Sequence, residues 1–368
     1  MATTLSNLSM TTNSSEDPMD NSSSCDSISP SSYQNKLIPA IYSFIFLMGF
    51  LGNVLVMTVL CQKSNRKTVA NTYMLNLALS DLLFLVSLPF WAIFYSFDYN
   101  WVFGRFMCKL CGSLLPVNVY ASIYFITCMS VDRYRAIVHP LQSQCSRNLC
   151  QARLVSCVIW VIAVLLTVPT MVFRDTIHIE ELNVTTCGLH QPTRPYLLPA
   201  LALTKNILAF SVPFGVIASC YWRIARHLVM EESSVDKSAK NVDRVMKMVV
   251  AVVLAFFICW FPFHVLTFLD VLISMKVMHS CWVRQVISTL MPFTLCLGFS
   301  NSAVNPFIYC FVGNHFREQL RRLYAEKVTS FSQTRDSISI RLSSYSRKLS
   351  DLKDTGALDA LDQPSRDS

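Results

Sequence analysis

The stretch VVAVVLAFFICWFPFHVLTFLD, residues 249–270, decides the class of fold. Its first 21 residues contain no Lys, Arg, Asp or Glu. A helix needs about 20 apolar residues to cross the hydrocarbon core of a bilayer, so this stretch predicts a membrane span. Further stretches of the same kind bring the predicted spans to residues 37–61, 72–97, 106–132, 154–173, 197–221, 246–275 and 283–311. We therefore expect an all-α membrane protein with a seven-transmembrane helix bundle.

The composition and the charge pattern agree with a membrane location. Hydrophobic residues make up 52% of the 368 and charged residues only 15%, against about 25% charged in soluble domains. The net charge of +8 could indicate nucleic-acid binding. However, 23 of the 31 Lys and Arg residues fall on the predicted inner side if the N-terminus is outside. This positive-inside bias predicts an N-terminus outside the plasma membrane, membrane lipid as a neighbour and no nucleic-acid partner.

The chain divides into four predicted parts. Residues 1–36 form a polar extracellular tail, 37–312 the bundle, 313–326 a short amphipathic helix on the membrane surface, and 327–368 a cytoplasmic Ser-rich tail. No cleavable signal peptide is evident, because residues 1–36 have no apolar core of the needed length. Ser344 and Ser350 each follow an Arg by three residues and are candidate phosphorylation sites. The Asn-X-Ser/Thr acceptor sites for glycosylation are Asn7, Asn13, Asn21 and Asn183, all on the predicted outer side.

Four of the 14 cysteines lie on the predicted outer side or at span mouths: Cys25, Cys108, Cys187 and Cys281. An even set in an oxidising compartment predicts two disulfides with three connectivities. Cys108 opens the third span and Cys187 lies in the longest outer loop, which favours this pair and leaves Cys25 with Cys281. The other cysteines are interpreted as small apolar side chains, and none has metal-ligand spacing.

A buried polar group is predicted around Asp81, in the middle of the second span. A carboxylate at this depth is costly, so it should face the bundle interior and meet polar partners or a cation. A protonated Asp81, hydrogen-bonded within the core, remains the alternative. The candidate partners lie on the third and seventh spans: Asn118, Ser122, Asn301 and Asn305.

Two proline motifs and one charged motif suggest elements with two arrangements. Pro262 in CWFPFH and Pro306 in NPFIY each remove a backbone donor and kink a helix. Trp260, beside the first proline, is a large side chain that would move when the helix bends. Asn305 and Tyr309 belong to the second motif. At the inner end of the third span, Asp132 and Arg133 precede Tyr134 and can form a local ion pair. Two kinks of this kind favour a bistable bundle.

Charged and aromatic residues gather near the predicted outer ends of the spans: Trp91, Arg174, Lys205, His264 and Asp270. Together they would line a cavity with cations, aromatics and one carboxylate, which suits a peptide better than a lipid or a small amine. Individually, Trp91 and Arg174 could be interfacial anchors and Asp270 a solvent-exposed acid. Lys205 could extend its ammonium to the interface, although its apolar surroundings favour a lined cavity.

The ordered motifs resemble those of the rhodopsin-like (class A) G-protein-coupled receptors. Gly52-Asn53, NLALSD, VDRY, CWFP and NPFIY each fall on the expected span, and the resemblance covers residues 37–325. Longer runs such as FITCMSVDRYRAIV, TKNILAF and VVLAFFICWFPFHVLTFLD are similar to the angiotensin II receptors, most of all to type 2. The resemblance implies a cell-surface receptor for angiotensin II or a related peptide hormone. Its cytoplasmic partner would be a G protein or an atypical transducer. Whether two copies of the chain form a dimer is left open.

The resemblance also implies roles for individual residues. In that family the lysine matching Lys205 binds the C-terminal carboxylate of the peptide, the arginine matching Arg174 supports it, and the tryptophan matching Trp91 packs against the ligand. Asp270 matches an acid facing the basic N-terminal part of the peptide. A second acid, expected at the start of the seventh span, is replaced by Ser288.

The remaining implied roles concern signalling. Trp260 matches the switch tryptophan and Arg133 the transducer-facing arginine. The Asp81 group matches a sodium pocket, with Ser302 at the place where the type 1 receptor has Asn, so a sodium ion is the one cofactor implied. A retinal protein is disfavoured because residues 283–311 contain no Lys. A transporter or channel is disfavoured by the absence of an internal repeat and by the odd span number. An enzyme is disfavoured because no nucleophile, metal site or nucleotide loop is arranged for catalysis.

Overall fold

The computed structural model describes residues 34–62, 68–140, 148–180, 183–190, 196–230, 239–312 and 314–354. The predicted glycosylation sites Asn7, Asn13 and Asn21 lie outside the described residues, as does Cys25. The chain forms two compact units, Met1–Asn314 and His315–Ser368.

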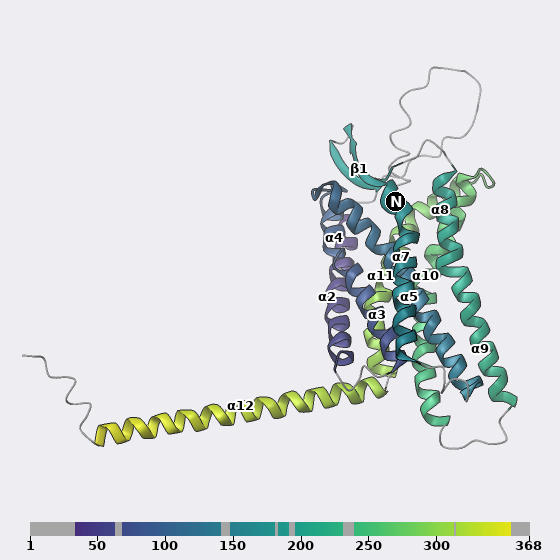
Figure 1. The fold of residues 1–368 in the computed structure, drawn as a ribbon. Coiled ribbons are helices and arrows are strands. Elements are labelled where there is room, and N and C mark those ends of the chain that lie inside the picture. Colours follow the sequence, from purple (N-terminus) through teal and green to yellow (C-terminus); the bar gives the residue numbers. More distant parts are fainter. Residues whose placement is uncertain are drawn as a thin grey trace, which may run out of the picture. The chain divides into compact units, whose positions relative to one another are not determined.

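Seven helical segments in the described part of the first unit are long and apolar enough to cross a membrane. They match the seven predicted spans and form one bundle (Figure 1). Five of them are single helices, whereas the second and the fifth are each built from more than one helical element. In chain order the elements are α2 (Gln34–Leu60), α3 (Val69–Leu85) with α4 (Leu88–Ser96), α5 (Gly104–Val138), α7 (Leu149–Phe173), α8 (Leu197–Asn206) with the π-helical turn η2 (Ile207–Ser211) and α9 (Val212–Met230), α10 (Ala239–Ser274), and α11 (Cys281–Val312).

Proline and polar side chains set where several of these helices begin and bend. The second span breaks between α3 and α4, where Pro89 occupies the first turn of α4 and fits there because its missing N–H needs no partner. The fifth span widens into the π-helical turn η2 just before Pro213. Thr68 caps the start of α3 by accepting a hydrogen bond from the Asn71 N–H, and Asn148 caps α7 in the same way through Cys150.

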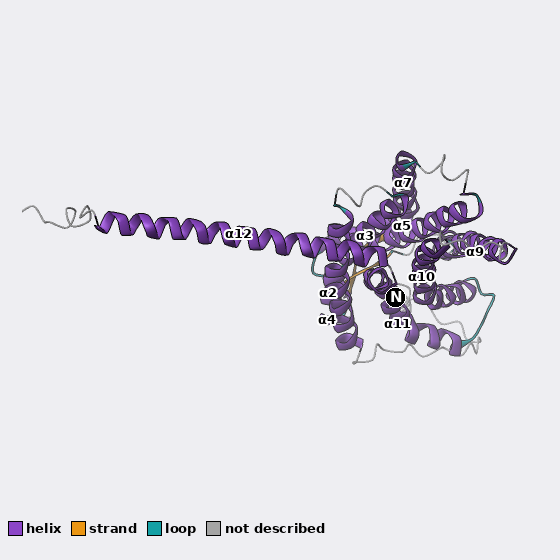
Figure 2. Cartoon of the chain, turned by 90° about the horizontal axis from the view of Figure 1, so that it is seen from below, coloured by secondary structure: helices purple, strands orange, loops and turns teal. Residues whose placement is uncertain are grey.

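The third span, α5, is the central helix of the bundle. It packs against α3, α7, α9 and α10, whereas α2 and α10 both pack against α11; Figure 2 shows the arrangement along the bundle axis. The interior is filled by side chains such as Phe84, Phe125 and Tyr309, each 1% exposed or less. Large apolar side chains on the outer helix faces remain exposed, among them Leu51, Leu165 and Ile258, as expected for surfaces that contact lipid.

A β-hairpin lies at one end of the bundle, called the hairpin end below. Its strands β1 (Arg174–Ile179) and β2 (Val184–Leu189) are antiparallel, with Arg174 opposite Leu189 and Ile179 opposite Val184. Asn183 in the connecting turn has a φ of 49°, a conformation that Asn tolerates better than most residues. Its side chain is exposed, so this acceptor site is accessible.

The cysteine prediction is confirmed for Cys108, which forms a disulfide with Cys187. Cys281 is also disulfide-bonded, but its predicted partner Cys25 is not among the described residues. The first disulfide ties strand β2 to the first turns of α5, across 79 residues of sequence.

In the second unit, α12 (Asn314–Asp354) continues past residue 326, where the sequence predicts the start of a Ser-rich tail. The physical reason is that residues 314–354 contain neither Gly nor Pro, and the next glycine is Gly356. An ion pair between Glu318 and Arg322, one turn apart, supports the helix. Ser344 and Ser350 lie on this helix and are exposed.

Candidate functional site

Two cations from different elements meet at the hairpin end of the bundle. Arg174 begins strand β1 and Lys205 lies near the end of α8, and their charges are close enough to interact. Among the described residues, no carboxylate forms an ion pair with either of them. Two neighbouring cations are unfavourable in a low-dielectric environment. An anion placed between them would relieve this repulsion.

Part of the Arg174 guanidinium has no hydrogen-bond partner among the described residues. The guanidinium carbon lies 5.5 Å from the centre of the Trp91 ring, and Nη1 lies 4.0 Å from the sulfur of Cys187. The Nε atom is buried and makes no hydrogen bond. Burial lowers the pKa of Arg174 to about 10, so the side chain still carries its charge at neutral pH.

Lys205 is surrounded by aromatic groups from α10. Its Nζ lies 4.8 Å from the centre of the Phe263 ring, a favourable cation–π geometry. His264 is 4% exposed and its Nδ1 lies 2.8 Å from Oδ1 of Asn206, the neighbour of Lys205 in sequence. The Asn206 amide nitrogen donates to the His264 carbonyl oxygen. Oδ1 must then accept from Nδ1–H, which leaves Nε2, buried and unpartnered, as an acceptor.

The structure brings together four of the six residues predicted to bind ligand, namely Trp91, Arg174, Lys205 and His264. Asp270 lies on α10 and Ser288 on α11, the two helices whose side chains Leu266, Ile273 and Ile287 form one apolar cluster. Asp270 interacts electrostatically with Arg284, and the Ser288 hydroxyl donates to the Gln285 carbonyl oxygen. The acid expected to meet a basic group on the ligand thus has a cation of the chain nearby.

The predicted polar group around Asp81 is present in the core. Asn118 donates to one carboxylate oxygen of Asp81 at 3.0 Å and Asn305 to the other at 2.9 Å. Ser122 and Ser302 both contact the Asn118 side chain. The group also contains Ser80, which the sequence reasoning did not single out. Asn301 is also buried, and its amide nitrogen has no hydrogen-bond partner within the described part of the chain.

The residues predicted to switch lie below the cation site and at the opposite end of the bundle. Trp260 is 2% exposed and contacts Phe256, Phe263 and His264. Pro262 and Pro306 lie inside α10 and α11, and Tyr309 is buried. At the end of α5, Arg133 forms an ion pair with Asp132, and Tyr134 lies near Arg223 of α9.

Residues 52–309 match the protein family described as the 7 transmembrane receptor (rhodopsin family). The chain belongs to the rhodopsin family of receptors. The type-2 angiotensin II receptor of Homo sapiens is 47% identical over 322 residues, 87% of this chain and 88% of the relative. The type-2 receptor of Mus musculus is 46% identical over the same length, 87% of this chain and 88% of the relative. The type-1 angiotensin II receptor of Sus scrofa is 38% identical over 316 residues, 86% and 88% of the two chains.

Membership of the rhodopsin family confirms two expectations from the sequence. The seven helical spans are those of a multi-pass membrane receptor. The prediction of a receptor and not an enzyme also holds, since the relatives are receptors. The residues that sequence reasoning missed, Asn206 and Phe263, are ordinary polar and aromatic side chains on apolar helices. Only their positions beside Lys205 reveal them.

Proposed function

We propose that this receptor binds angiotensin II or a closely related peptide, with the C-terminal carboxylate of the peptide between Lys205 and Arg174. The observation that carries the proposal is the pair of neighbouring cations without a carboxylate partner in the described chain. A ligand carboxylate supplies the missing charge and an acceptor for the buried Nε of Arg174. The relatives bear the name of angiotensin II receptors, which selects the peptide to test first.

The aromatic side chains around the cations give the ligand's last residue an apolar surface. Trp91 lies against Arg174, and Phe263 lies against Lys205. His264 offers its Nε2 as an acceptor for a hydrogen-bond donor on the ligand. These contacts favour a peptide with an apolar or aromatic C-terminal residue.

The experiment compares angiotensin II with the same peptide carrying a C-terminal amide, on wild-type receptor and on Lys205→Gln. The wild type should prefer the acid by about 10- to 100-fold, the range for a buried charge-assisted hydrogen bond. The Lys205→Gln variant should lose most of this preference. Equal affinity of the wild type for acid and amide would refute the carboxylate role. Thr204→Ala, which removes an exposed hydroxyl on the neighbouring residue, is the matched control.

The other end of the peptide is proposed to face Asp270 and Ser288. Asp270 shares its surroundings with Arg284, so it attracts a basic ligand group less strongly than a free acid would. We expect fragments shortened at the N-terminus to lose little affinity here. A displacement series with such fragments, repeated on Arg284→Gln, tests this, because removal of Arg284 should strengthen binding of the peptide with the basic group.

Signalling is proposed to follow a shift between two arrangements of the bundle. The peptide contacts α8 and α10 near Trp260, and Pro262 gives α10 a place to bend. A ligand that binds one arrangement more tightly raises its population, which would free Arg133 for a G protein or another cytoplasmic transducer. The N-terminus and hairpin are assigned to the extracellular face of the plasma membrane, on the support of the positive-inside charge pattern.

A sodium ion is proposed as an allosteric ligand of the Asp81 group. The group fits a hard cation because the atoms that could coordinate it are oxygens. They belong to Asp81, Ser122 and Ser302. The Oδ1 atom of Asn305 is buried beside Asp81 and has no hydrogen-bond partner among the residues that the structure describes. The melting temperature of purified receptor should rise in NaCl relative to choline chloride, and Asp81→Asn should abolish this difference. A difference that persists in Asp81→Asn would rule out this site.

A further inference from the structure

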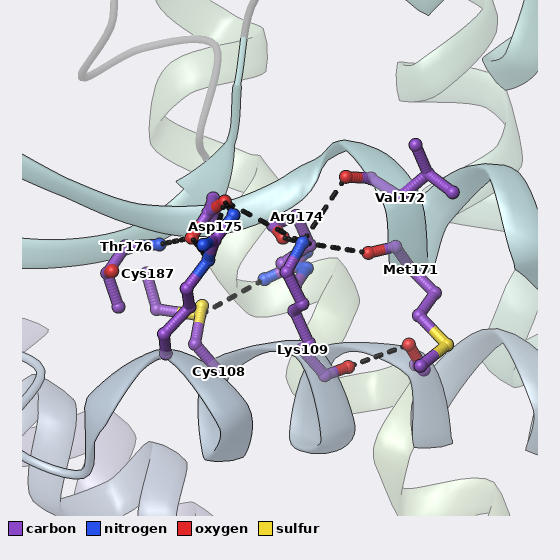
Figure 3. Close-up of polar contacts among 10 residues, drawn as sticks. Cys108, Lys109, Met171, Val172, Arg174, Asp175, Thr176 and Cys187 are labelled. Carbon is purple, nitrogen blue, oxygen red and sulfur yellow. Dashed lines mark hydrogen bonds and ion pairs between the residues drawn. A yellow bond between two sulfur atoms is a disulfide. The ribbon is translucent and has the colours of Figure 1, made fainter.

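One face of α5 contacts the segment that runs from the end of α7 into the hairpin (Figure 3). The face consists of Arg105, Cys108, Lys109 and Gly112. Their spacing of three, four and seven residues places all four side chains on the same side of a helix. Each meets a different part of the segment, so this face can fix where the hairpin and Arg174 lie.

Three of these residues hold the backbone and the strands. Arg105 forms two parallel hydrogen bonds with Asp175, from Nε at 2.8 Å and from Nη2 at 2.6 Å. Cys108 holds strand β2 through Cys187. Lys109 donates from Nζ to the carbonyl oxygen of Arg174 at 2.6 Å, and to two carbonyls at the end of α7 at 3.3 Å each.

Gly112 has a different relation to the segment, because the side chain of Arg174 passes directly over it. A Cβ atom at residue 112 would lie 1.8 Å from Cδ and 2.3 Å from Nε of Arg174. These separations are far below van der Waals contact, so any other residue displaces the arginine. All three nearest atoms belong to Arg174. The glycine therefore serves this one side chain and not the close approach of a neighbouring helix.

We propose that Gly112 is a positioning residue that sets the place of the Arg174 guanidinium, while Lys109 holds the backbone of the same arginine. This inference rests on the proposed function, in which Arg174 binds the carboxylate of a peptide. A glycine inside a helix is unfavourable by itself. The Arg174 side chain, which also lies against Trp91, needs the space that a Cβ atom at residue 112 would fill. This need explains why a glycine stands in the buried part of α5.

The first experiment needs no ligand. It measures the melting temperature of purified full-length receptor for Gly112→Ala, Arg174→Ala and the double variant. Gly112→Ala should lower the melting temperature in the wild-type background. In the Arg174→Ala background it should cause no loss and a small gain, since the colliding atoms are then absent and Ala favours a helix over Gly. An equal loss in both backgrounds would overturn the proposal. If Gly112→Ala alone fails to fold, recovery of folded receptor by the double variant supports it, and failure of both overturns it.

The second experiment measures the preference for angiotensin II over its C-terminal amide. Gly112→Ala should reduce this preference about 10-fold or more while changing affinity for the amide little. The reason is that the substitution displaces the Arg174 guanidinium, which donates hydrogen bonds to the peptide carboxylate. Lys109→Met should act in the same direction. Gly215→Ala is the matched control, since a Cβ at Gly215 would meet no atom within 4 Å. Wild-type receptor without acid preference refutes the proposed function, whereas wild-type preference retained in Gly112→Ala refutes only the positioning role.

Discussion

The indole ring of Trp260 lies against Gly298, across the contact between α10 and α11. A Cβ atom added at Gly298 would come within 2.8 Å of Cζ3 and 2.9 Å of Cε3 of the ring. The glycine thus leaves room for the large side chain beside Pro262. In this arrangement the position of Trp260 depends on α11 as well as on its own helix.

The first prediction follows from this contact. Gly298→Ala should destabilise the arrangement described here by about 1–3 kcal/mol, the usual cost of overpacking a core. Other arrangements of Trp260 then gain population, and basal transducer activation changes. Thermal unfolding and basal nucleotide exchange by a G protein, both on reconstituted receptor, measure the two effects. Gly215→Ala should alter neither. Wild-type values for Gly298→Ala would show that the ring moves freely.

A second prediction concerns the carboxylate at the centre of the bundle. Asn305→Ala removes the 2.9 Å hydrogen bond to Oδ2 of Asp81 and leaves that oxygen without this donor in the core. We expect a loss of about 1–3 kcal/mol of stability, the penalty for a buried group deprived of its partner. Thermal unfolding in sodium-free buffer measures it. Thr58→Ala, which removes an exposed hydroxyl bonded to its own helix, should have little effect.

A third prediction gives the pH dependence of the hairpin. Hydrogen bonds from Arg105 hold the pKa of Asp175 below its ordinary value. A carboxyl whose pKa is lowered by folding stabilises the protein above its unfolded pKa of about 3.9 and loses this effect as the pH falls through the folded value. The melting temperature of Asp175→Asn should therefore be lower than that of the wild type by a constant amount between about pH 5 and pH 8.

The control for this pair is a double variant. Arg105→Gln should show the same loss, and adding Asp175→Asn to it should cause no further change. High salt should reduce the difference, because the Arg105 side chain is 69% exposed and solvent ions can reach the pair. A difference between wild type and Asp175→Asn that persists well below the folded pKa would assign the effect to packing and not to charge.

The sequence was sufficient to predict the features that depend on local chemistry. Apolar runs located the seven spans, because each run is a property of one short segment. The disulfide between Cys108 and Cys187 was predicted from where each cysteine lies relative to the spans. Lys205 was recognisable because a cation within an apolar helix is costly. Helix α12 runs to Asp354 through the Ser-rich residues, because neither Gly nor Pro interrupts residues 314–354.

The features that sequence reasoning missed depend on contacts between distant segments. Arg105 and Asp175 are 70 residues apart, and neither lies in a recognisable motif. Gly112 is unremarkable until the path of the Arg174 side chain is known. The same holds for Asn206, whose role depends on His264, 58 residues away. Such pairings are set by how helices and strands pack, which periodicity along one segment does not report.

The last prediction concerns Asp132 and Arg133 at the end of α5. The two side chains form an ion pair, and both are largely buried, with 8% and 12% of their side-chain surface exposed. Asp132→Asn keeps the shape of the side chain but removes its charge, so Arg133 is restrained less in the present arrangement. A bias of about 1.4 kcal/mol toward the released arrangement changes its population tenfold. We expect basal nucleotide exchange to rise by a factor of this order, measured with reconstituted receptor and G protein without peptide. Asp98→Asn makes the same chemical change at an exposed position of the hairpin end and should leave the basal rate unchanged. An unchanged or lower rate in Asp132→Asn would show that the ion pair does not restrain the inactive arrangement.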